Sequence, residues 1–198
     1  FPFPGRASHA AASPHLGRSA LDAVELMNVG VNYMREHMSD QARVHYAYID
    51  AGGISPNVVQ ARAKVRYVVR EPSAKAMMKL IERVKSVARG AAMMTETEVD
   101  ARMVTAASEL LPNAPLCAAM QKNLELLGAP PFDAGDRAYA AKMQASFSED
   151  EIAASYALAG LQEDVRKPLA DFVVPADTPA VDLPGSTDVA DVSWVVPA

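Results

Sequence analysis

The sequence has 198 residues, of which 50% are hydrophobic and 22% are charged, which is typical of a globular protein with one or two domains. A formal net charge of −5 argues against a surface that binds nucleic acid or an anionic membrane. No apolar run approaches the roughly 20 residues that a membrane-spanning helix needs. We therefore expect neither a nucleic acid nor a membrane as partner.

The chain has a single cysteine, Cys117, which excludes an internal disulfide and fits a reducing compartment. We therefore expect a cytoplasmic location. Cys117 lies in the apolar segment 115–120, and this setting predicts that it is a small buried hydrophobic residue.

Both ends of the chain are unusual. It begins with Phe1-Pro2-Phe3-Pro4, without an initiator methionine or a signal peptide, and it stops directly after an apolar stretch. Natural termini tend to be polar and frayed. We therefore expect the chain to be a piece of a larger protein.

The first hundred residues alternate between strand and helix patterns. Residues 1–6 carry aromatic side chains at alternate positions and predict a short strand. Ser19 is a predicted N-cap, and apolar residues at spacings of three and four over residues 20–34 predict a helix behind it. Residues 43–49 predict a second strand.

Alternation is clearest in residues 59–70, where apolar and cationic residues take turns, as in a strand with one face on a core and the other in solvent. An apolar stripe over residues 77–91 predicts a second helix. Residues 99–103 predict a fourth strand with Ala101 and Met103 facing inward. The resulting order, βαββαβ, predicts a ferredoxin-like α+β module.

The character of the sequence changes at Leu110. Residues 115–127, 134–147 and 149–159 predict three helices, and residues 168–198 contain short apolar runs interrupted by prolines. These segments have no evident core of their own. We expect them to be helices and strands that complete an α/β sheet whose other strands lie upstream.

Four histidines are candidates for chemistry: His9, His15, His37 and His45. His9 and His15 are separated by five residues around a proline, whereas two metal ligands on one helix face would be three or four apart. No nucleophile elbow surrounds Ser8, so the pair Ser8-His9 does not predict a serine hydrolase. The residue chemistry alone therefore predicts no complete active site.

Three motifs resemble those of a known family. The first, residues 5–23, contains Gly-Arg-Ala-Ser-His-Ala and Pro-His-Leu-Gly-Arg-Ser. The other two are residues 52–59 (Gly-Gly-Ile-Ser-Pro-Asn-Val-Val) and residues 185–194 (Gly-Ser-Thr-Asp-Val-Ala-Asp-Val-Ser-Trp). They resemble the co-catalytic metallopeptidase and amidohydrolase family, which includes carboxypeptidase G, the aminoacylases and the aminobenzoyl-glutamate hydrolases. The last group is the most similar branch, and the resemblance covers essentially all 198 residues.

The resemblance implies an organisation in two parts. Family members have an α/β catalytic domain interrupted by an inserted βαββαβ lid, which also dimerises. Residues 1–111 would then be the lid, and residues 112–198 an incomplete part of the catalytic domain. The expected partner is a second copy of the chain, bound through the lid.

The resemblance also assigns roles to five residues. His9 matches the lid histidine that reaches a substrate carbonyl or carboxylate, usually in the active site of the partner subunit, where it can stabilise a tetrahedral intermediate. Asn57 matches a lid asparagine near the substrate. Arg70 matches an arginine suited to binding a substrate carboxylate, although alternation alone explains it as the solvent-exposed end of a strand. Ser186 and Thr187 match a loop at the active-site wall, where typical members have Ser-Glu-Asp.

The family implies two divalent ions, Zn or Mn, and a glutamate general base, all held by positions outside residues 1–198. We therefore expect no metal on this chain, and no activity of the chain by itself. The complete protein would hydrolyse the amide bond of an N-acyl or p-aminobenzoyl amino acid, a small-molecule substrate. The alternative is a stand-alone, non-catalytic module for dimerisation or ligand binding, and the length of the gene product would discriminate between the two.

Overall fold

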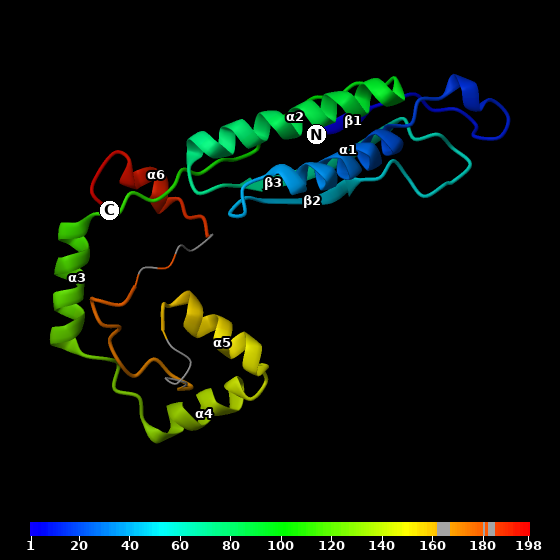
Figure 1. Ribbon diagram of the computed structural model, residues 1–198. Coiled ribbons are helices and arrows are strands. Elements are labelled where there is room, and N and C mark those ends of the chain that lie inside the picture. The colour runs from blue at the N-terminus through cyan, green and yellow to red at the C-terminus, as the bar shows by residue number, and fades with distance from the viewer. Residues whose placement is uncertain (162–166, 180, 182–184) are drawn as a thin grey trace. The chain divides into compact units, whose positions relative to one another are not determined.

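The computed structural model describes residues 1–161, 167–179, 181 and 185–198, and these form two compact units, Phe1–Glu109 and Leu110–Ala198 (Figure 1). None of the described helices is long and apolar enough to cross a membrane.

The first unit is built on a three-stranded antiparallel sheet in the order β1-β3-β2. The strands are β1 (Pro2–Pro4), β2 (Arg43–Asp50) and β3 (Arg62–Arg70). All three were predicted, although β3 begins later than the alternating pattern does. Tyr46 of β2 is directly opposite Tyr67 of β3, which fixes the register of the two long strands.

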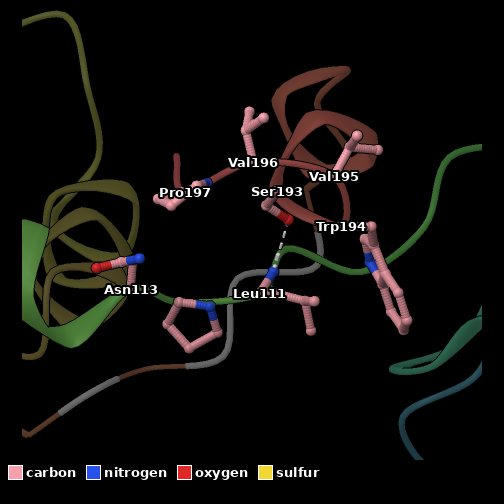
Figure 2. A pocket seen from close by; sticks show the side chains of 8 residues that line it. Leu111, Asn113, Ser193, Trp194, Val195, Val196 and Pro197 are labelled. Carbon is pink, nitrogen blue, oxygen red and sulfur yellow. Dashed lines mark hydrogen bonds between the residues drawn. The ribbon is translucent and has the colours of Figure 1, made fainter.

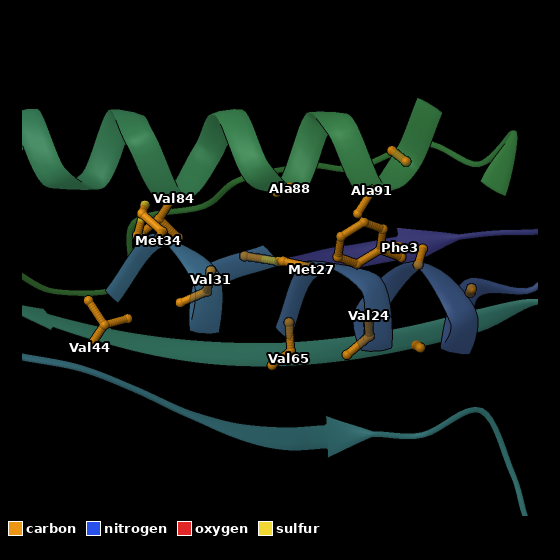
Figure 3. Close-up of a cluster of buried hydrophobic side chains, with 14 of the residues drawn as sticks. Phe3, Val24, Met27, Val31, Met34, Val44, Val65, Val84, Ala88 and Ala91 are labelled. Atoms are coloured by element: carbon orange, nitrogen blue, oxygen red, sulfur yellow. The ribbon is translucent and has the colours of Figure 1, made fainter. Parts of the chain in front are cut away.

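Two helices, α1 (Ala20–Met34) and α2 (Ala74–Thr95), pack on the sheet and on each other, as predicted (Figure 3). Ser19 and Ser73 cap them, and each side chain accepts a hydrogen bond from the backbone N–H of the third helical residue. Two short 3₁₀ helices complete the unit: η1 (Pro14–Leu16) and η2 (Arg35–His37).

A single hydrophobic core lies between the helices and the sheet. Its largest completely buried side chains include Phe3 of β1, Met27 of α1 and Val65 of β3 (Figure 3). Burial of such a side chain stabilises a fold by about 1.5–3 kcal/mol. The sixteen buried core residues therefore account for why this unit is compact.

The predicted fourth strand, residues 99–103, is wrong as a strand, since Ala101 and Met103 are exposed and no ladder forms. Residues 98–100 do run beside β1: the N–H of Glu98 donates to the Pro4 carbonyl at 3.3 Å, and the N–H of Asp100 to the Pro2 carbonyl at 3.2 Å. The return bonds would need N–H groups on these two prolines, which have none. The observed unit is therefore a mixed α+β fold with a three-stranded sheet.

The second unit contains the helices α3 (Ala114–Leu127), α4 (Ala134–Gln144), α5 (Glu149–Leu158) and α6 (Val189–Ser193). The first three confirm the predicted helices. Gly128 ends α3 with a φ of 71°, a conformation that favours glycine.

Packing in the second unit differs from the prediction. The described part of residues 110–198 contains no strand, although we expected strands in residues 168–198. A strand needs a neighbour for its backbone hydrogen bonds, and no such neighbour is present in this part. Cys117 is exposed rather than buried, because α3 has no buried residue and hence no core to face.

Candidate functional site

His9 occupies an exposed loop that follows β1. Its ring Nδ1 accepts hydrogen bonds from the backbone N–H groups of Ala11, at 3.2 Å, and Ala12, at 3.1 Å. A ring nitrogen that accepts two hydrogen bonds carries no proton, so the imidazole proton is on Nε2. His9 therefore presents a hydrogen-bond donor away from its own loop.

The structure brings His9 next to Asn57. His9 forms an isolated antiparallel bridge with Val58, and the Asn57 carbonyl accepts a hydrogen bond from Ala10 N–H at 2.9 Å. Both loops extend from the same end of the sheet (Figure 1). Two residues that are 48 positions apart in the sequence thus form one exposed pair.

Close packing around Gly17 holds the two loops of this pair together. A Cβ atom at Gly17 would overlap the side chains of Ser8 and Val59, so only glycine allows the two loops to approach each other here. Ser8 Oγ is buried and forms no hydrogen bond with any described residue. A buried hydroxyl beside a histidine whose Nδ1 is already occupied is not an activated nucleophile, which agrees with the absence of a serine-hydrolase motif.

Arg70 lies at the other end of the sheet. It is the last residue of β3, it is half-buried, and it is directly opposite Arg43 of β2. Arg62 and Arg70 are eight residues apart in β3, which corresponds to about 26 Å. His9 pairs with Val58, before β3 begins, so His9 and Arg70 of one chain do not reach the same small molecule.

The carboxylate of Asp50, the last residue of β2, forms hydrogen bonds within the chain. Asp50 accepts hydrogen bonds from the Gly52 N–H at 2.8 Å and from Arg62 Nε at 3.0 Å, and these bonds hold the pKa of Asp50 below its usual value, with the Gly52 bond the larger cause. Asp50 therefore closes a turn and is not a general base.

Ser186 and Thr187 lie in the second unit, just before α6. Both are exposed, and Thr187 Oγ1 accepts a hydrogen bond from the Val189 N–H at 3.3 Å. Thr187 therefore helps to begin α6.

Among the described residues, two surface hollows are lined by none of the predicted site residues. One, in the second unit, has a volume of about 290 Å³ and a mixed lining that includes Trp194, Val196 and Asn113. Ser193 Oγ accepts a hydrogen bond from Leu111 N–H beside it (Figure 2). The other, in the first unit, has a volume of about 440 Å³ and contains the ion pair of Arg18 with Glu96.

Within the described residues, no group of three or more His, Cys, Asp or Glu side chains is placed to hold a metal ion. His9 and His15 alone offer too few ligands for a divalent cation, which in proteins is usually held by three or more protein ligands. The residues described here therefore do not fit a metal centre of their own.

No family model matches the chain. Comparison with known proteins shows 44% identity over 205 aligned residues to the B subunit of the p-aminobenzoyl-glutamate hydrolase of Escherichia coli, an alignment that covers 98% of this chain and 43% of that protein. The Xaa-Arg dipeptidase of mouse is 35% identical over 127 residues, which cover 63% of this chain and 29% of the dipeptidase. The chain thus spans less than half the length of the curated relatives it matches.

Solved structures agree. An aminobenzoyl-glutamate utilization protein from Klebsiella pneumoniae matches with a TM-score of 0.54 and 28% identity, over 63% of this chain and 31% of that one. The chain is therefore similar to proteins of the amidohydrolase and peptidase family, as its motifs predicted. Its sequence is similar along almost its whole length to part of the aminobenzoyl-glutamate hydrolase protein of Escherichia coli.

Proposed function

We propose that this chain is the substrate-contacting part of a longer amide hydrolase that cleaves N-acyl amino acids such as p-aminobenzoyl-glutamate. The 44% identity over 98% of the chain supports the substrate class. The observation that carries the proposal is the exposed His9–Asn57 pair, in which His9 has its proton on Nε2. A neutral imidazole donor of this kind stabilises the negative charge that develops on an amide oxygen during hydrolysis.

Residues 1–111 are proposed to be the lid, in a ferredoxin-like arrangement, and residues 112–198 part of the catalytic domain. Ser186 and Thr187 would line the wall of the active site. The catalytic ions, Zn or Mn, would supply Lewis-acid chemistry, with ligands on residues outside this chain. This chain's own role is to bind and orient the substrate with His9, Asn57 and Arg70.

The separation of His9 from Arg70 supports a homodimer. Because about 26 Å of strand lies between the two ends of β3, one substrate can contact both residues only if they come from different subunits. His9 of the partner subunit would then act beside Arg70, in line with lid-mediated dimerisation.

Complementation of the complete hydrolase tests this arrangement. We expect His9→Ala and Arg70→Ala to have strongly reduced activity separately and to regain activity when the two variants are mixed and reassembled. If each site is shared across a two-fold axis, random pairing makes half of the dimers mixed, and each mixed dimer has one intact site out of two. The mixture should therefore have about a quarter of wild-type activity. No recovery would show that both residues serve the same subunit.

The role of His9 is tested by His9→Ala, with His15→Ala as the matched control from the same exposed segment. We expect the first change to lower kcat by about 100-fold, as for loss of one oxyanion donor, with metal content unchanged, and the second to have little effect. Loss of metal in His9→Ala would mean that His9 is a ligand instead. A non-catalytic dimerisation module, the alternative function, requires that the complete protein hydrolyses no N-acyl amino acid.

A further inference from the structure

Two arginines close the base of the loop that carries His9. The backbone N–H of Arg6 donates to the Arg18 carbonyl at 2.8 Å, and the N–H of Arg18 donates to the Arg6 carbonyl at 2.9 Å. Both guanidinium groups then bind back to the loop, because Arg6 Nε and Arg18 Nη1 donate to three consecutive carbonyls around the end of η1, those of His15, Leu16 and Gly17. The returning arm of the loop, residues 15–18, is therefore fixed by cationic side chains.

Arg18 also ties this loop to the end of α2. Its Nε and Nη2 both donate to Glu96 Oε2, at 2.8 and 2.7 Å, across 78 positions of the sequence. Glu96 directly follows α2, whose last turns are packed in the core through Ala91 and Ala92, so its backbone belongs to a rigid element. The ion pair thus connects the His9 loop, which extends beyond this end of α2, to a fixed point of the first unit (Figure 1).

The backbone of Glu96 is strained. Among the residues that the structure describes, Glu96 is the one non-glycine residue with a positive φ, at 51°. A helix commonly ends on a glycine in this left-handed conformation, because a side chain is disfavoured there. Strained residues cluster at functional sites, so the strain indicates a task for the Glu96 carboxylate.

Global stability does not explain the ion pair. The Arg18 side chain is 31% exposed and that of Glu96 is 71% exposed, and such exposed pairs stabilise a fold very little. The pair has a direct route to His9 instead, since Gly17, whose carbonyl accepts a hydrogen bond from Arg18, packs against Ser8. Ser8 directly precedes His9, so a contiguous set of contacts runs from Glu96 to His9.

The geometry points to Arg18 and Glu96 as positioning residues for His9. Together they hold the returning arm of the loop and, through it, the arm that presents His9 beside Asn57. A hydrogen-bond donor stabilises a developing charge only when it lies where that charge forms, so a donor on an exposed loop needs such support. This inference rests on the proposed function, which makes His9 that donor.

Amide exchange in the full 198-residue chain tests whether the ion pair orders the loop. The reporter is the Ala10 N–H, which donates to the Asn57 carbonyl at 2.9 Å. Glu96→Gly removes the carboxylate and relieves the left-handed backbone, so we expect Ala10 to exchange about fivefold faster, the scale of one exposed ion pair, while the urea midpoint is unchanged or rises. Glu96→Ala loses the carboxylate but keeps the strain, so it should accelerate Ala10 equally and have a lower urea midpoint than Glu96→Gly.

Glu98→Ala is the matched control, because Glu98 is an exposed acid of the same surface hollow that forms no ion pair with a described residue. It should leave the exchange of Ala10 as in wild type. Unchanged exchange of Ala10 in both Glu96 variants would overturn the proposal. Equal acceleration of the core amides of α1 would overturn it as well, since the pair would then support the whole unit rather than the loop.

Kinetics of the complete hydrolase separate positioning from substrate binding. We expect Glu96→Gly to lower kcat about fivefold and to leave KM unchanged, because His9 acts in the transition state. A higher KM with an unchanged kcat would mean that Glu96 serves substrate binding. Unchanged values of both would mean that order in the loop does not limit catalysis, and either result would overturn the assignment.

The positioning role and the proposed function fail separately. If the complete protein hydrolyses no N-acyl amino acid but the exchange of Ala10 responds to Glu96→Gly, the proposed function fails while the ordering of the loop by the ion pair stands. If the complete protein is active and neither Glu96 variant changes the exchange of Ala10, the positioning assignment fails while the proposed function stands.

Discussion

The two units of this chain differ in how much hydrophobic core each one has. The first buries sixteen hydrophobic residues in one core, whereas Ala190 is the only buried residue among those described in the second. The apolar side chains of α3 are instead exposed, with Leu126 at 82% and Leu127 at 81%. Helices α4 and α5 have 11 and 10 residues, lengths at which an isolated helix is marginal in water.

Local signals compensate in part for the missing core. Asp133 and Ser148 each form a complete capping box at the start of α4 and α5, and three acidic residues in the first turn of α5 favour its dipole. The comparison teaches that capping and composition are enough to specify a helix, but that burial is needed to place one. We therefore expect the same kind of substitution to have different effects in the two units.

The largest difference is expected for a methionine in each unit. Met27→Ala removes a completely buried side chain from the core and should lower the free energy of unfolding by about 3 kcal/mol, within the range for Met→Ala in a core. Met120→Ala in α3, where the side chain is 65% exposed, should change it by less than about 0.5 kcal/mol. Urea denaturation followed by circular dichroism measures both.

A loss of similar size in Met120→Ala would break the comparison, because it would mean that α3 packs against a core in solution. The exposed Met93 of α2, at 80%, serves as a control within the first unit and should resemble Met120.

A smaller effect is expected at the helix caps. Ser19→Ala removes the cap of α1 and should cost about 1 kcal/mol of the global stability of the first unit, because α1 unfolds only when the core opens. Ser148→Ala removes the capping box of α5 and should instead increase local amide exchange in α5 while leaving the main unfolding transition unchanged. Hydrogen exchange by residue distinguishes the two results, and a shift of the main transition in Ser148→Ala would show that the units unfold together.

Much of the fold could be predicted from the sequence, because its elements are specified locally. Ser19 caps α1 as predicted, and alternation along β3 indicated the buried face correctly. The exposure of Cys117 could not be predicted, since it depends on whether a partner surface covers α3. A local pattern indicates which face of a segment is apolar enough to be buried, but tertiary contacts determine whether that face is covered.

The candidate site shows the same limit. The motifs single out His9 and Asn57, but their proximity depends on the backbone pairing of two loops that are 48 positions apart, which no local pattern contains. The position of Arg43 opposite Arg70 follows from the register of β2 on β3.

The smallest effect is expected at the β1 edge of the sheet, where the first unit, like the second, lacks a complete set of strand hydrogen bonds. Residues 98–100 donate two hydrogen bonds to β1 and receive none from it, because Pro2 and Pro4 have no N–H. Pro4→Val should restore one donor at a position where a β-branched residue fits a strand. The new hydrogen bond gains about 1 kcal/mol, and the more flexible unfolded chain costs about 0.4–1 kcal/mol, so stability should hardly change.

The informative measurement is therefore amide exchange rather than denaturation. We expect the amide introduced by Pro4→Val to be protected through a bond to the Glu98 carbonyl, and the amides of Glu98 and Asp100 to exchange more slowly than in wild type. Pro72→Val, in the exposed turn before α2, is the matched control and should give a rapidly exchanging amide. If the two introduced amides exchange equally fast, the prolines are not what limits the fourth strand, and the absence of a core contact for Ala101 and Met103 becomes the cause. Protection of the amide introduced in β1 would instead show that this edge is two hydrogen bonds short of the predicted βαββαβ sheet.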